Sequence, residues 1–318
     1  MTEAATVELD AQYRAMREEA GLVERPGFTF IAVSGSEAVD YLQGQVTNDV
    51  EAIEPGGGRY AALLDRKGHL QADLRALRTG DEEFLLVAEG EVGPPLLKHL
   101  STYKIGRDVE VVDRSAELAL ISLIGPRSGE LSGAEGLGPE HASRELTVAG
   151  ASARAIATDS GIDLIAEAGD AEAVAAALLD AGAERATEAA AEILRVESGR
   201  PRYGFEMSEA TMPAEAGIVE RAVDFEKGCY IGQEPVARLH YRGRPNRVLR
   251  GLRLSGPAEA GATLSLGEKE VGRIGTSVVS PAHGPVALAV VRREAEPGAK
   301  IEVEGGGPAE VVELPFQV

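Results

Sequence analysis

The sequence predicts an α+β fold, with mixed helices and strands over residues 1–247 and a small barrel or sandwich over residues 248–318. Before residue 247, apolar strand-like runs such as 118–124 alternate with helical patterns such as 171–181. After it, short alternating strands recur between turns about 8–12 residues apart, which is typical of a small barrel or sandwich. A chain of 318 residues is long enough to bury a core in each part.

The first half of the chain contains a hairpin signal and a helix-start signal. Ser34 and Glu37 stand three residues apart before an apolar periodic stretch, which predicts a capping box. Asp65-Arg66-Lys67-Gly68 separates two strand-like runs and predicts a hairpin with its glycine at the bend. The elements expected here are a helix at 5–20, a strand at 28–33, a helix ending near 46, strands at 60–64, 71–77 and 84–88, a helix at 94–103 and a strand at 109–112.

The middle of the chain and its C-terminal part give further elements. Asp170 is expected to cap the helix at 171–181, and residues 129–150, rich in Gly, Ser and Glu, are expected to form a loop. Glu197 ends a helix that begins near Thr187, where the helix dipole disfavours a carboxylate, so Glu197 needs a specific reason to be there. The remaining strands are expected at 118–124, 162–166, 248–254, 262–266, 271–279, 285–291, 300–303 and 310–314.

Charge and cysteine content argue against broad nucleic-acid binding and exclude an internal disulfide. The formal net charge of −20 argues against a broad nucleic-acid-binding face. Pro235–Pro257 is the exception, because it carries six arginines and no acid; it is either a local anion site or a solvated surface whose arginines pair with carboxylates elsewhere. One cysteine makes no internal disulfide, and no apolar run is long enough for a membrane span. With no secretory signal at the N-terminus, we expect a soluble cytoplasmic protein.

The run from Lys227 to Glu234 holds the only cysteine, Cys229, between Gly228 and Gly232. Lys227 places a cation near the sulfur, which favours the reactive thiolate. The alternative is a buried cysteine that only packs. Asp73 falls inside a strand, so its carboxylate faces either solvent or a cleft. No P-loop, Rossmann or zinc-hydrolase motif is present, the histidines lack metal-ligand spacing, and no metal site is expected.

Three motifs together resemble the YgfZ-like folate-binding proteins, a branch of the glycine-cleavage T-protein (aminomethyltransferase) superfamily. The octapeptide Lys227–Glu234, continuing to Arg238, resembles the signature of that branch. Residues 41–49 (Tyr-Leu-Gln-Gly-Gln-Val-Thr-Asn-Asp) and 195–204 (Arg-Val-Glu-Ser-Gly-Arg-Pro-Arg-Tyr-Gly) look like its N-terminal and central motifs, which the superfamily shares.

The resemblance implies two antiparallel-sheet/helix lobes around a central folate channel, the second lobe inserted around 60–117, plus the barrel. It implies tetrahydrofolate, or a folate derivative, as cofactor, and iron–sulfur proteins, including tRNA-modification enzymes, as the proteins served. By position, Cys229, Lys227 and Asp73 would form the reactive centre. The predicted folate-binding residues are Glu197, Tyr230, Gln233, Arg238 and Arg200. A pterin N–H edge suits a fixed carboxylate such as Glu197, and the arginines of Pro235–Pro257 suit a polyglutamate tail.

Three functions follow as hypotheses. The first is a tetrahydrofolate-dependent factor for the assembly or maintenance of iron–sulfur proteins, with Cys229 as its reactive group. The alternative is a folate-dependent aminomethyltransferase or other one-carbon transferase using Asp73. Aminomethyltransferases of the superfamily carry Asp-Asp-Leu where this chain has Ala72-Asp73-Leu74, which puts that activity in question. The third is a non-catalytic module whose Arg238–Arg253 segment holds RNA or an acidic partner.

Overall fold

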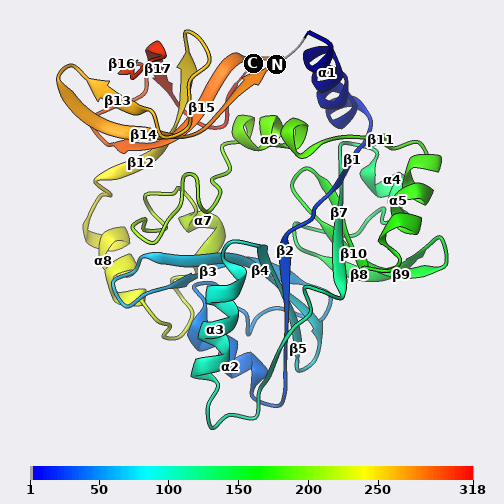
Figure 1. The fold of residues 1–318 in the computed structure, drawn as a ribbon. Coiled ribbons are helices and arrows are strands. Elements are labelled where there is room, and N and C mark those ends of the chain that lie inside the picture. The colour runs from blue at the N-terminus through cyan, green and yellow to red at the C-terminus, as the bar shows by residue number, and fades with distance from the viewer. Residues whose placement is uncertain (1–2, 318) are drawn as a thin grey trace. The chain divides into compact units, whose positions relative to one another are not determined.

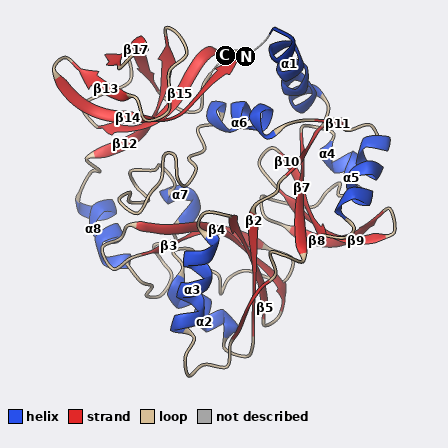
Figure 2. Cartoon of the chain, viewed as in Figure 1, coloured by secondary structure: helices blue, strands red, loops and turns tan. Residues whose placement is uncertain are grey.

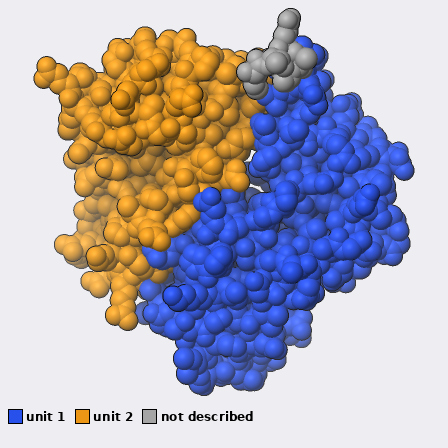
Figure 3. Space-filling view, viewed as in Figure 1, with its two compact units in different colours: residues 1–63, 71–191, 222–231 blue, residues 64–70, 192–221, 232–318 orange. Residues whose placement is uncertain are grey.

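A computed structural model describes residues 3–317, with side chains described from residue 7 onward, and shows an α+β fold with a closed C-terminal barrel (Figures 1 and 2). The chain divides into two compact units (Figure 3). Unit 1 comprises residues 1–63, 71–191 and 222–231, and unit 2 comprises residues 64–70, 192–221 and 232–318. Within residues 3–317, no helix is long and apolar enough to span a bilayer.

Unit 1 is built on two sheets. The five-stranded sheet has the order β3-β4-β5-β2-β6 and the six-stranded sheet has the order β11-β1-β7-β10-β9-β8. The strands are β1 (Gly21–Glu24), β2 (Phe28–Ser34), β3 (Gly58–Leu64), β4 (Leu70–Gly80), β5 (Glu83–Glu89), β6 (Glu110–Asp113), β7 (Leu118–Ile124), β8 (Ser143–Val148), β9 (Ala151–Ala157), β10 (Gly161–Glu167) and β11 (Glu184–Arg185). The helices are α1 (Glu3–Glu18), α2 (Ala38–Gln45), α3 (Gly93–Tyr103), α4 (Ser128–Ser132), α5 (Ala171–Asp180) and α6 (Glu188–Glu197), which ends in unit 2.

The two sheets of unit 1 share one apolar core. Phe30, Leu77 and Val87 from the five-stranded sheet pack with Ile156 and Ile165 from the six-stranded sheet, and all are buried. Most of their neighbours along the strands are apolar and buried as well, as expected for strands that are covered on both faces. Burial of five such side chains contributes on the order of 10 kcal/mol before the entropy of ordering is subtracted.

Unit 2 contains the barrel, whose six strands close in the order β12-β15-β14-β13-β16-β17. Its elements are α7 (Val219–Ala222), α8 (Gln233–Arg242), β12 (Arg247–Leu254), β13 (Thr263–Leu266), β14 (Lys269–Ser280), β15 (Gly284–Arg292), β16 (Lys300–Val303) and β17 (Gly307–Val312). Val196 of α6 packs on the barrel with Leu249, Val286, Leu288 and Phe316. The fold class predicted from the sequence, including the small barrel, is therefore confirmed.

Some local expectations are wrong. Ser34 ends β2 instead of capping a helix, and Glu37 caps α2 without a side-chain bond; its carboxylate accepts the N–H of Asp108 at 2.6 Å instead. Asp170 does occupy the N-cap position of α5, as expected, but its side chain makes no capping hydrogen bond. Residues 129–150, expected as a loop, contain most of α4 and all of β8. Because β8 lies at the sheet edge, its exposed polar side chains give no apolar pattern.

Candidate functional site

Lys227 fixes the start of the octapeptide to the end of α2 within unit 1. Its Nζ donates to the backbone oxygens of Gln43, Val46 and Asn48 at 2.8, 2.7 and 2.8 Å, so all three ammonium protons have acceptors. A cation at a helix C-terminus is favoured by the helix dipole. The Lys227 charge is thus directed at carbonyl groups, and the side chain orders the segment that carries Cys229.

The environment of Lys227 is mostly buried and bordered by acids. Burial lowers the pKa of Lys227 to about 8, while the carboxylates of Asp49, Asp224 and Glu51 act in the opposite direction. Asp224 also shapes the turn, because its Oδ1 accepts the backbone N–H groups of Glu226 and Lys227 at 2.8 and 3.1 Å. The octapeptide therefore begins from a fixed turn with a buried cation.

Cys229 and Tyr230 differ in exposure. Cys229 is exposed, so the alternative of a cysteine that only packs in the core is wrong. Tyr230 is 7% exposed, and its ring centroid lies 5.3 Å from the Lys227 Nζ. Burial raises the pKa of Tyr230 to about 12. Its hydroxyl has no hydrogen-bond partner among the described residues, and such a buried group costs about 1–3 kcal/mol unless a bound molecule satisfies it.

Asp73 lies on β4 and its carboxylate is held in place. The Tyr60 hydroxyl donates to Asp73 Oδ2 at 2.8 Å, and Asn48 Nδ2 donates to the Tyr60 backbone oxygen, also at 2.8 Å. Asn48 in turn offers its own carbonyl to Lys227. Asp73 is half-buried, and a continuous series of contacts within unit 1 connects it to Lys227.

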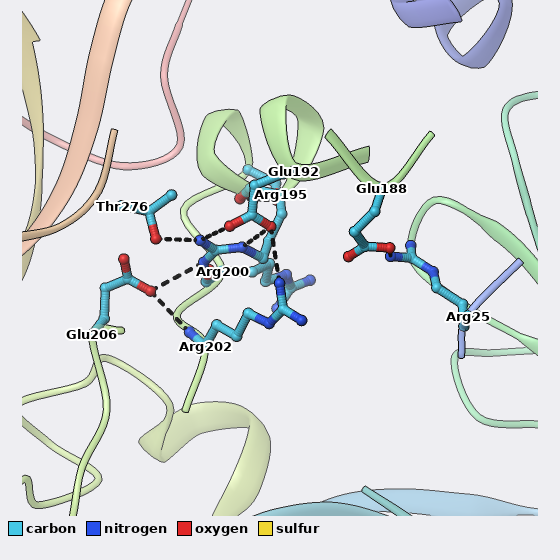
Figure 4. Close-up of polar contacts among 9 residues, drawn as sticks. Arg25, Glu188, Glu192, Arg195, Arg200, Arg202, Glu206 and Thr276 are labelled. Carbon is cyan, nitrogen blue, oxygen red and sulfur yellow. Dashed lines mark hydrogen bonds and ion pairs between the residues drawn. The ribbon is translucent and has the colours of Figure 1, made fainter. Parts of the chain in front are cut away.

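A buried polar network follows Asp73 along the same strand. Arg75 Nη1 bonds to Asp163 Oδ2 at 2.5 Å, and the Ser122 hydroxyl donates to Asp163 Oδ1 at 2.6 Å. Arg25 Nε donates to Ser122 Oγ at 3.1 Å, and Arg25 also pairs with Glu188 (Figure 4). Arg75 belongs to the five-stranded sheet and Asp163 to the six-stranded sheet, so this network joins the two sheets of unit 1.

In unit 2, Glu197 is the buried carboxylate at the end of α6. The Ser280 hydroxyl donates to Glu197 Oε1 at 2.5 Å, and the Glu197 backbone oxygen accepts the N–H of Phe316 at 2.9 Å. Ser280 Oγ accepts the N–H groups of Ala282 and His283, so its proton is directed to Glu197. The helix dipole disfavours a carboxylate at a helix C-terminus, and these contacts stabilise Glu197 there.

Arg195, two residues before Glu197, uses all five of its N–H donors (Figure 4). Nε and Nη2 contact the two oxygens of Glu192 at 2.8 and 2.7 Å. Nη2 also donates to Thr276 Oγ1 at 2.7 Å, and Nη1 donates to Glu206 Oε2 at 3.1 Å and to the backbone oxygen of Arg200. The side chain of Glu206 is fully buried, so its charge depends on this arginine.

Comparison with known proteins assigns the family. The GCVT N-terminal domain family matches residues 3–227, and the glycine cleavage T-protein C-terminal barrel domain family matches residues 247–317. An aminomethyltransferase of Saccharopolyspora erythraea is 31% identical over 96% of this chain and 89% of its own length. One from Thermus thermophilus is 33% identical over the same shares. The crystal structure of the glycine cleavage system aminomethyltransferase T from Bartonella henselae covers 97% of this chain and 89% of its own, with 24% identity and a TM-score of 0.87.

The chain belongs to the glycine cleavage T-protein family. Aminomethyltransferases of this family use tetrahydrofolate, as the resemblance implied. Within unit 2, the buried Glu197 carboxylate is an acceptor of the kind that pterin N–H groups require. Within unit 1, the Tyr230 hydroxyl lacks a protein partner in the described chain.

The structure separates the predicted site residues of this T-protein family member into two groups. Unit 1 holds Cys229, Lys227, Tyr230 and Asp73. Unit 2 holds the other predicted folate ligands, which are Glu197, Arg200, Gln233 and Arg238. Gln233 is the first residue of α8 and Arg238 is exposed on that helix, and neither side chain makes a hydrogen bond or ion pair within residues 3–317. Arg200 is half-buried and its carbonyl accepts from Arg195.

Sequence reasoning missed several polar residues around these groups, although some signals were available. Asp163 lies inside an apolar strand, a position that a carboxylate occupies only with a partner. Glu192 and Arg195 stand three residues apart on a predicted helix, which is ion-pair spacing. Tyr60 and Ser280 gave no such signal, because their partners are 13 and 83 residues away.

Proposed function

We propose that this protein transfers a one-carbon unit from an aminomethyl donor to tetrahydrofolate, with Asp73 as the acid or base. The observation that carries the proposal is the Asp73 carboxylate, half-buried and fixed by the Tyr60 hydroxyl at 2.8 Å, in a chain of the glycine cleavage T-protein family. A carboxylate that is positioned but not sealed from solvent can exchange a proton with a reacting nitrogen.

The missing acid at position 72 does not weaken this assignment. Side chains alternate across a strand, so residues 72 and 73 of β4 point to opposite faces. Ala72 is fully buried in the core, whereas Asp73 and Arg75 lie on the polar face. An aspartate at 72 would enter the apolar core and would not share the site of Asp73. We therefore propose Asp73 alone as the acid or base, a role with which Ala72 is compatible.

The proposed reaction balances with these groups. The donor loses its aminomethyl carbon and nitrogen, tetrahydrofolate takes the carbon as a methylene bridge, and its two N–H hydrogens leave with the donor atom and with ammonia. Asp73 moves one of these protons. Glu197 of unit 2 is proposed to accept hydrogen bonds from the pterin, and a contact of Tyr230 with folate stays a prediction. Contacts of Arg200, Gln233 and Arg238 with folate stay predictions.

Asp73→Asn tests this function, because the amide keeps the size and the Tyr60 contact but moves no proton. We expect kcat for methylene-tetrahydrofolate formation from an aminomethylated protein donor to fall about 100-fold or more, with the Kd for tetrahydrofolate changed less than about threefold. Asp81→Asn, an exposed position in the same unit, is the matched control and should keep full activity. Unchanged turnover in Asp73→Asn would remove the proposed role.

A second candidate function is maintenance of iron–sulfur proteins in the manner of the YgfZ-like branch. The exposure of Cys229, in an octapeptide that resembles the signature of that branch, favours it. An accessible thiol can act as a nucleophile or carry a fragment in transit. Cys229→Ala should then fail to restore iron–sulfur enzyme activity, including tRNA modification, in cells lacking the protein, while Asp73→Asn restores it. Full rescue by Cys229→Ala would reject this second function.

A further inference from the structure

The six arginines of Pro235–Pro257 fall into two classes in the structure. Arg250 pairs with Glu313 at 3.2 Å, and Arg253 donates to the backbone oxygen of Gln317 at 3.1 Å, so these two are used by the barrel. The other four are exposed, and their side chains make no ion pair or hydrogen bond within residues 3–317; they are Arg238, Arg242, Arg244 and Arg247. Although the sequence holds 52 acidic residues, these four neighbouring guanidinium groups have no partner in the described part of the chain.

These four arginines lie on α8 and on the segment that leads into β12 (Figure 1). Arg238 and Arg242 are four residues apart, which places them on one face of the helix. Tyr241, 67% exposed, stands on the same side, and its ring packs edge-on against His240 with centroids 4.8 Å apart. We name the surface formed by Arg238, Arg242, Arg244, Arg247, His240 and Tyr241 the α8 basic surface.

We propose that the α8 basic surface binds an acidic polypeptide segment of a protein partner. Arginine binds carboxylates in a bidentate manner, and four exposed guanidinium groups fit a run of Asp and Glu side chains. Tyr241 supplies apolar contact area at low entropic cost. Small ligands bind in concave sites that bury most of their surface, whereas an exposed helix face suits a polypeptide.

Charge outside the α8 basic surface argues against nucleic acid as the occupant. All 52 acidic residues lie outside Pro235–Pro257. Duplex DNA carries a charge about every 1.7 Å of its axis and α8 is only about 15 Å long, so a duplex would run onto carboxylates beyond the arginines. A short acidic peptide segment can end where the basic surface ends.

The test measures fluorescence anisotropy of a labelled oligo-glutamate peptide of about eight residues titrated with the full-length protein. We expect saturable binding that weakens as salt rises from about 50 to about 150 mM, and no binding of an oligo-glutamine peptide. Arg242→Gln/Arg244→Gln should lose about tenfold in affinity. Arg14→Gln/Lys98→Gln removes the same charge from exposed positions of unit 1 and should change affinity less than about twofold.

Three experimental outcomes would contradict the proposal. Equal affinity of the Arg242→Gln/Arg244→Gln variant and the wild type would overturn it. Tighter binding of a single-stranded oligonucleotide with the same number of charges would assign the surface to nucleic acid instead. Displacement of the peptide by monoglutamyl tetrahydrofolate would place the peptide in the folate site. Because the proposal does not depend on folate chemistry, peptide binding should persist in Asp73→Asn whether or not that variant is active.

Discussion

Replacing Arg195 by methionine tests the cluster that surrounds Glu206 in unit 2. The substitution keeps most of the buried side-chain volume and removes all five donors. Glu192 is partly exposed and regains water, but the Glu206 side chain is fully buried and keeps only the backbone N–H of Arg202 at 3.0 Å. Its other oxygen, Oε1, already has no partner in the described chain. The carboxylate is left as an uncompensated buried charge, so we expect a loss of about 3–5 kcal/mol.

The loss is measured by urea unfolding and by the thermal midpoint. With about 2–4 °C per kcal/mol for a chain of this size, a loss of about 3–5 kcal/mol should lower Tm by about 6–20 °C. Arg66→Met, an exposed arginine of the same unit, is the matched control and should change stability by less than about 0.5 kcal/mol.

A double variant separates the ion pair from general packing. Glu206→Gln in the Arg195→Met background removes the stranded charge and should recover about 2 kcal/mol, a coupling typical of residues in one network. A loss below about 1 kcal/mol in Arg195→Met, or strict additivity in the double variant, would refute the reasoning.

Three further predictions concern the octapeptide. Lys227→Met leaves two buried carbonyls without their donor and should destabilise the protein by about 2–4 kcal/mol in chemical denaturation, whereas a Lys227 with a purely chemical role would leave stability unchanged. In the folded protein the pKa of Lys227 is about 8, below its ordinary value of 10.5, so between pH 8 and 10.5 the unfolded state binds more protons than the folded state. The free energy of unfolding of the wild type should therefore rise by about 2–3 kcal/mol relative to Lys227→Met over this pH range. Parallel stability profiles for the two proteins would contradict this. Gly232→Ala should lower the free energy of unfolding by about 2–4 kcal/mol in the same assay, because φ at Gly232 is +83° and the new Cβ would lie 2.4 Å from the Asp65 carbonyl oxygen. Gly228→Ala is the control and should leave stability unchanged, because no atom lies within 4 Å of the new Cβ.

The barrel could be predicted closely from the sequence because its strands are short, apolar and separated by turns, and β16 and β17 alternate between core and surface. The expected strand at 300–303 coincides with β16, and that at 248–254 differs from β12 by one residue. Helix α8 was not predicted from the sequence. Pro235 lies in its first turn, the one part of a helix that tolerates proline, whereas a proline within a helical pattern usually indicates a break.

The reactive groups of the candidate site could be predicted only in part from the sequence. The octapeptide, Glu197 and Asp73 can be identified by residue type. The partners of Lys227 are backbone carbonyls, which every residue has, so the sequence does not indicate which of them bind it. The role of Ser280 likewise depends on a contact across 83 residues. Local composition identifies reactive groups, whereas the groups that orient them are set by tertiary contacts.

Calorimetric titration of tetrahydrofolate tests the central claim most directly. The wild type should bind with saturable one-to-one stoichiometry, and Glu197→Gln should weaken binding about tenfold or more, because a carboxylate that accepts ligand N–H groups is replaced by an amide. Glu302→Gln, an exposed barrel position, should bind like the wild type. Absence of binding would contradict the proposal that this chain is a folate-dependent transferase, and equal affinity in Glu197→Gln would contradict the proposed role of Glu197.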